Sequence, residues 1–117
     1  MMITTIDELL AARLGDYRLL TISWVYGGEN LIAFLSKASS GLVLRLAFVW
    51  ATEVHIELDF GESFGEPLLF DATFTPTEGG SWNVNLDFAG APRGSLSLSC
   101  NDILVKTLQK EECAFLM

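Results

Sequence analysis

The stretch that decides the fold class is LVLRLAFVWATEVHIELDF, residues 42–60. Every second residue from Leu42 is apolar, with Thr52 alone out of the pattern. A period of two over this length indicates β-strand with one buried face. Fully extended, the stretch would reach roughly 60 Å, whereas a compact domain of this size has a radius of gyration of about 13 Å. We therefore expect it to bend or break, with the corner at Trp50 to Glu53.

The residues between the apolar positions change character halfway along this stretch. In the first half they are apolar apart from Arg45, and in the second half they are titratable. The first set is Val43, Ala47, Val49 and Ala51, and the second is Glu53, His55, Glu57 and Asp59. The pattern predicts that the first half is buried on both faces and the second half on one.

Composition limits both the class of protein and its partners. The chain has 117 residues, of which 50% are hydrophobic, and this fits a single domain spanning 1–117 with an ordinary core. The net charge is −8, which argues against nucleic acid and anionic membranes as partners because both require a basic surface. An excess of carboxylates instead suits a basic partner attracted over a long range.

The N-terminal residues MMITTIDE lack the basic and continuously apolar regions of a secretory signal. No apolar run approaches the roughly 20 residues of a membrane-spanning helix. We therefore expect a cytoplasmic protein in which Cys100 and Cys113 are free thiols, with Cys100 serving as a small core residue.

Helix and strand signals divide the rest of the chain. Thr5 and Glu8 form a capping-box pattern that predicts a short helix over 5–15, ending near Gly15. Strands are expected at 17–26 and 31–37 and at a last strand near 101–108. Apolar sets also begin at Val54 and at every fourteenth residue after it, separated by loops that contain Gly and Pro. The course of the tail, 109–117, stays open.

These elements predict a mainly β protein, an antiparallel β-sandwich or a partly open barrel with a meander and one N-terminal helix. The helix should dock on the second face of the first half of residues 42–60.

The most informative surface is the predicted solvent face of the meander. Its members are polar or charged and share one strand phase: Glu53, His55, Glu57, Asp59, Asp71, Thr73, Asn83, Asn85, Asp87, Ser97 and Ser99. A solvated face is one interpretation, and a docking surface for a basic protein is another. A third takes Glu53, His55 and Glu57 as metal ligands. With one His in the chain, we expect neither metal nor cofactor.

Catalytic motifs do not appear in this sequence. There is no Gly-x-Ser-x-Gly elbow, and the Gly-rich segment at 61–65 lacks the Lys of a phosphate loop. We therefore expect no catalytic residues and no enzyme.

The predicted interior is rich in aromatic side chains. In this interpretation seven of them point inward: Phe48, Trp50, Phe60, Phe70, Phe74, Trp82 and Phe88. They could line the cavity of a small-ligand-binding barrel or simply fill the core.

Two segments resemble a known family. The double strand Leu-x-Leu-x-Phe followed by Val-x-Ile-x-Leu, and the closing strand LSCNDILV at 98–105, are similar to bacterial polymorphic-toxin immunity proteins of the Imm50-like kind. The resemblance covers residues 16–106 as a strand pattern. It implies a small, β-rich, non-enzymatic protein that covers a toxin, with acidic members suited to basic nuclease toxins.

The sequence thus predicts a non-catalytic protein-binding module of the immunity type. Its binding residues would be Glu53, His55, Glu57, Asp59, Asp71 and Asp87, and its partner would be a basic protein. Pairing of a sheet edge with a second copy is a further expectation, and a metal-dependent enzyme using His55 is the remaining alternative.

Overall fold

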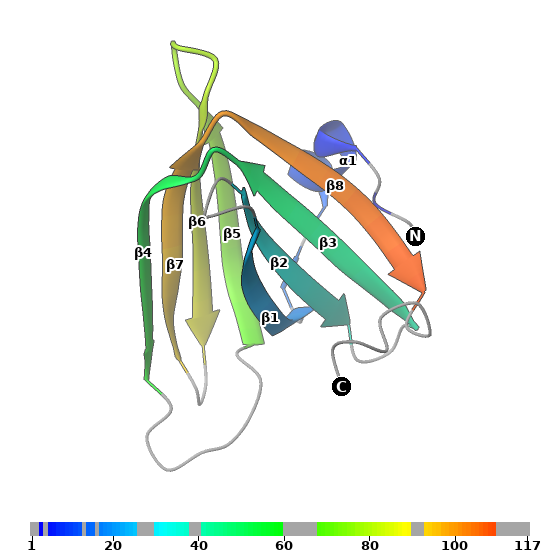
Figure 1. Ribbon diagram of the computed structural model, residues 1–117. Helices are drawn as coiled ribbons and strands as arrows, with labels where there is room; N and C mark the ends of the chain where they lie inside the picture. The colour runs from blue at the N-terminus through cyan, green and yellow to red at the C-terminus, as the bar shows by residue number, and fades with distance from the viewer. Residues whose placement is uncertain are drawn as a thin grey trace.

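The computed structural model describes residues 3, 5–12, 14–15, 17–25, 30–37, 41–59, 68–89 and 93–109. One short helix precedes eight strands (Figure 1). In chain order the elements are α1 (Ile6–Ala11), β1 (Tyr17–Val25), β2 (Asn30–Lys37), β3 (Leu42–Val49), β4 (Thr52–Asp59), β5 (Leu68–Pro76), β6 (Trp82–Ala89), β7 (Arg93–Cys100) and β8 (Asp102–Gln109). The prediction of a mainly β, antiparallel fold with an N-terminal helix is confirmed.

The eight strands form one antiparallel sheet in the order β4-β7-β6-β5-β1-β2-β3-β8. The sheet folds into two parts, whose strands run in clearly different directions in Figure 1. We call β4, β5, β6 and β7 the polar half-sheet, and β1, β2, β3 and β8 the buried half-sheet. One residue pair, Arg18 with Leu68, joins them through β1 and β5. The end strands β4 and β8 do not pair with each other, so the sheet is not closed into a barrel.

Residues 42–59 and 93–109 run beside each other as two long bent strands. Val49 pairs with Asp102 before the bend and Thr52 with Ser99 after it, and Asn101 N donates to Val49 O at 2.8 Å. Trp50 and Glu53 have φ angles of 54° and 52°, in the left-handed region that turns the chain. The corner therefore lies where the sequence predicts it.

This pairing across the bend also determines which strand neighbours β4. The predicted meander places β5 beside β4. This prediction is wrong, because the strand beside β4 is β7. Since β3 already pairs with β8, continuing both chains through the corner brings β4 against β7. The strands β5, β6 and β7 form the predicted consecutive hairpins.

The main core lies on the inner faces of both half-sheets. It is built from alternate residues of the strands, together with Ile3, Leu9 and Leu14 from the N-terminal region. Its buried strand residues are Leu19, Leu31, Ala33, Leu35, Leu44, Leu46, Phe48, Leu69, Val84, Leu86, Phe88, Leu96, Leu98, Cys100 and Ile103. Cys100 is a free, buried cysteine, as predicted for a small core residue.

A second, smaller cluster occupies the other face of the buried half-sheet. It contains Ile32, Phe34, Val43 and Ala47, and this confirms that β3 is buried on both faces. The expected docking of α1 on this face is wrong. Leu9 of α1 packs with the main core instead, and this packing stabilises a helix that is too short to be stable alone.

The helix begins where the sequence predicts and ends earlier. Thr5 Oγ1 accepts a hydrogen bond from Glu8 N at 3.2 Å and donates to Glu8 Oε1 at 3.0 Å, so the two residues interact as a capping pair. The last helical residue is Ala11, and the extended C-cap is Ala12 rather than a residue near Gly15. Ending there leaves Leu14 outside the helix and inside the core.

The aromatic interior is smaller than predicted. Phe48 and Phe88 are buried, and Phe74 and Trp82 pack at the margin of the core. Trp50 and Phe70 are instead 54% and 73% exposed, because Trp50 lies in the corner and Phe70 lies at a register shift of β5. Phe60 lies outside the described residues, as do Cys113 and most of the tail. Among the described residues the sheet does not close into a barrel, and Trp50 and Phe70 do not point into an interior.

Within the described part of the chain, no helix has the length and apolar character that crossing a membrane requires.

Candidate functional site

The outer face of the polar half-sheet carries three rows of polar side chains, each crossing four strands. Strand register defines the rows, because residues directly opposite each other in a sheet share a face. The first row is Thr52, Ser99, Asn83 and Thr75; the second is His55, Ser97, Asn85 and Thr73; the third is Glu57, Ser95, Asp87 and Asp71. We call these residues, with Glu53 and Asp59 of β4, the outer polar face.

The third row concentrates the negative charge of the outer polar face. Asp71 lies directly opposite Asp87, and Ser95 separates Asp87 from Glu57. Like charges placed directly opposite on neighbouring strands destabilise a sheet, so folding alone gives no reason for the Asp71–Asp87 pair. Asp59 extends the charge along β4, where it lies opposite Arg93.

Side-chain hydrogen bonds order part of the outer polar face. Asn85 Nδ2 donates to Asp87 Oδ2 at 2.8 Å, and Ser99 Oγ donates to Asn83 Oδ1 at 2.8 Å. Asp71 Oδ1 accepts from Ala72 N at 3.0 Å. The carboxylates of Asp71 and Asp87 are thus each oriented by a donor from the protein and remain acceptors for a partner.

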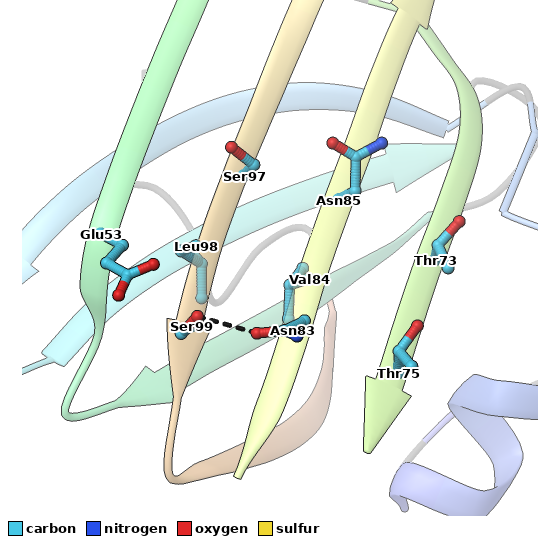
Figure 2. A pocket seen from close by; sticks show the side chains of 9 residues that line it. All are labelled: Glu53, Thr73, Thr75, Asn83, Val84, Asn85, Ser97, Leu98 and Ser99. Carbon is cyan, nitrogen blue, oxygen red and sulfur yellow. Dashed lines mark hydrogen bonds between the residues drawn. The ribbon is translucent and has the colours of Figure 1, made fainter. Parts of the chain in front are cut away.

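Beside the acidic row lies a shallow hollow of about 400 Å³. Figure 2 shows side chains from all four strands around it, with the Glu53 carboxylate extending from β4 toward β7. The polar lining residues are Glu53, Thr73, Thr75, Asn83, Asn85, Ser97 and Ser99. Hydroxyl, amide and carboxylate groups can hydrogen-bond to polar groups of a partner.

The alternative interpretation, in which Glu53, His55 and Glu57 are metal ligands, does not match the geometry of these side chains. His55 Nε2 lies 3.8 Å from Glu57 Oε2, and both side chains are largely exposed. Glu53 lies across a register shift from His55 and has a positive φ angle, so it does not continue their alternation. Among the described residues, no three or more His, Cys, Asp or Glu side chains are arranged to hold a metal ion.

The buried thiol of Cys100 is unsuited to nucleophilic chemistry. Burial, reinforced by the negative charge of Asp102, raises the pKa of Cys100 to about 11. A thiol must ionise to act as a nucleophile, so Cys100 stays protonated and inert near neutral pH.

Strand β4 combines the outer polar face with a free sheet edge. Of the described strands, β7 alone pairs with β4, which ends the sheet on that side. Ile56 points to the inner side of β4 and is still 43% exposed, because no further strand covers it there. The opposite end strand, β8, is contacted by α1.

The six binding residues predicted from sequence all lie on the polar half-sheet. Register aligns Glu57, Asp71 and Asp87 in the third row and places His55 in the second, while Glu53 and Asp59 lie further along β4. Ser95, Thr52 and Thr75 also belong to the rows and were missed. Thr75 and Ser95 continue the same period-two patterns by one step, so this signal could have found them. The exposure of Ile56 could not be predicted from the sequence, because it depends on β4 being the strand at the end of the sheet.

These features define an acidic, antiparallel β protein in which β4, at one end of the described sheet, combines a polar face with an unpaired edge. The chain matches no known protein-family model and no curated protein sequence.

Proposed function

We propose that this protein is a non-catalytic protein-binding module that uses the outer polar face to bind a basic partner protein. The observation that carries the proposal is the third row, where register aligns Glu57, Asp87 and Asp71 on an exposed face. The opposed pair Asp71 and Asp87 lowers the stability of the sheet. A cationic surface bound here would offset this repulsion, because both carboxylates would attract its positive charges.

The charge of the whole chain supports the same partner class. A net charge of −8 attracts basic proteins over a distance and speeds their association. The resemblance to Imm50-like immunity proteins suggests a specific partner, a basic toxin that this chain would bind and cover.

The test begins with the proteins encoded by the neighbouring genes. Each is co-expressed with the chain, and a basic protein that co-purifies is measured for affinity and association rate at low and high salt. We expect the association rate to fall with added salt, because screening weakens attraction between exposed charges.

A matched pair of double variants locates the binding surface. Glu57→Lys with Asp71→Lys reverses two charges on the outer polar face. Asp7→Lys with Asp102→Lys makes the same change of net charge near α1 and β8, both at exposed positions. The first variant should weaken binding at least about tenfold more than the second, a difference of about 1.4 kcal/mol. Equal effects of the two variants would show that net charge alone matters and would contradict the proposed face.

A further inference from the structure

We propose that the basic partner binds by adding an extended segment to the free edge of β4. The segment would carry alternating basic and apolar side chains and would extend the polar half-sheet by one strand. This inference rests on the proposed function. It specifies how the partner binds and which sequence pattern its binding segment has.

The first support is the position of β4 at the end of the sheet. An end strand directs alternate N–H and C=O groups away from its neighbour, and an incoming strand can pair with these groups. The register between β4 and β7 shifts between Thr52 and His55 and is then continuous from His55 to Asp59. Regular backbone is therefore available over this part of the edge, away from the corner.

The second support is the different chemistry of the two sides of β4. On the outer side Glu57 lies between His55 and Asp59, and on the inner side Ile56 is 43% exposed. Side chains of an added strand alternate in the same way and lie opposite those of β4. A basic residue on the outer side would face Glu57, and an apolar residue on the inner side would cover Ile56.

The two ends of the sheet differ in how they are covered. On β8, Ile3 N donates to Thr107 Oγ1 at 3.1 Å, Thr107 Oγ1 donates to Ile3 O, and α1 packs nearby. On β4, no described segment other than β7 forms comparable packing. β4 is thus the end strand against which no other described element besides β7 packs closely, and its backbone edge is available for strand addition.

Charge complementarity favours a basic segment over a second copy of this chain. Pairing β4 with its own copy would bring together two strands that each carry Glu53, Glu57 and Asp59, in chains of net charge −8. Carboxylates on an edge strand are a known protection against such self-pairing. The same carboxylates attract a strand that carries lysine or arginine.

The probe for this inference is the capped peptide Lys-Val-Lys-Val-Lys-Val-Lys-Val. Two further peptides carry N-methyl groups on all lysines or on all valines. Neighbouring residues of a strand direct their N–H groups to opposite edges. Strand addition therefore predicts that one methylated peptide binds more than about tenfold more weakly than the parent, while the other binds within about twofold.

Hydrogen exchange and two variants then place the peptide on the chain. Amides of β4 should gain protection when the parent peptide binds, and those of β8 should not. Ile56→Lys should weaken binding more than about fivefold. The matched change Leu104→Lys, at an exposed apolar residue of β8, should leave it unchanged.

Three outcomes would overturn strand addition: equal binding of both methylated peptides, unchanged exchange at β4, or no binding of the parent peptide. Dimerisation of the chain through β4 would also overturn it, by identifying a second copy as the occupant. The proposed function is judged separately by the charge-reversal pair at Glu57 and Asp71. A partner that responds to those reversals while β4 exchange stays unchanged would retain the acidic face and reject the added strand.

Discussion

Strands β3 and β4 continue a single apolar alternation in the sequence and have opposite environments in the fold. Most residues of β3 are buried, whereas no residue of β4 is fully buried. The difference arises from their neighbours, because β3 lies between β2 and β8 while β4 lies at the end of the sheet beside β7. Alternation therefore sets the side to which each residue points, and the position of the strand in the sheet sets how deeply that residue is buried.

The largest effect that tests this contrast comes from truncating one apolar residue in each strand. Phe48 of β3 is 0% exposed, and Phe48→Ala should reduce the free energy of unfolding by about 3–5 kcal/mol. Ile56→Ala in β4 should cost less than about 1 kcal/mol, because much of that side chain already contacts water. Urea denaturation measures both values, and similar losses would contradict the difference in burial.

The second prediction concerns the attachment of β4 to β7. Gly94 has a φ of +150°, and a Cβ atom there would lie 1.8 Å from the carbonyl oxygen of Glu57. Gly94→Ala should therefore lower the free energy of unfolding by about 1–3 kcal/mol and increase hydrogen exchange in β4.

Gly41→Ala is the matched control for Gly94→Ala, since a Cβ atom at Gly41 meets nothing within 4 Å. It should leave both the free energy of unfolding and the exchange in β4 close to wild type. Equal effects at the two glycines would show that the close approach of β7 to Glu57 does not matter.

A third prediction tests the burial of the Cys100 thiol on the inner face of the polar half-sheet. The pKa of Cys100 is raised from 9.0 to about 11, mainly by burial. The protonated thiol is thus favoured by folding, and this stability is fully present below pH 9 and is lost as the pH rises toward 11. The free energy of unfolding should fall more across this range in wild type than in Cys100→Ala. Parallel pH curves would contradict the burial of the thiol.

The smallest effect is expected at the opposed carboxylates of β5 and β6. Asp87→Asn removes the like-charge pair with Asp71 and should raise the free energy of unfolding by a few tenths to about 1 kcal/mol. The same change should weaken binding of a basic partner. Thermal unfolding and affinity measurements check the two parts, and a variant that is less stable than wild type would show that the pair is not strained.

Much of the fold follows from local patterns in the sequence. The period-two alternation located the strands, and the length of residues 42–60 required the corner near Trp50. Thr5 and Glu8 marked the start of α1. These signals work because each depends on residues close together in the chain.

The features missed from the sequence depend on contacts between distant segments. The pairing of β4 with β7 follows from the continuation of β3 and β8 through the corner, and nothing within β4 encodes it. Most residues of the outer polar face were predicted from the strand alternation, but the opposition of Asp71 and Asp87 depends on a register shift in β5. The exposure of Trp50 and Phe70 has the same kind of origin, since corners and bulges turn side chains out of the strand alternation.

The most direct test of the acidic face is the footprint of a basic partner on the ¹⁵N-labelled chain, recorded by nuclear magnetic resonance. Binding through the outer polar face predicts shift changes at amides of β4, β5, β6 and β7, centred on the row that contains Glu57, Asp87 and Asp71. Changes confined to α1 and the buried half-sheet would contradict it and would place the binding site on the other side of the molecule.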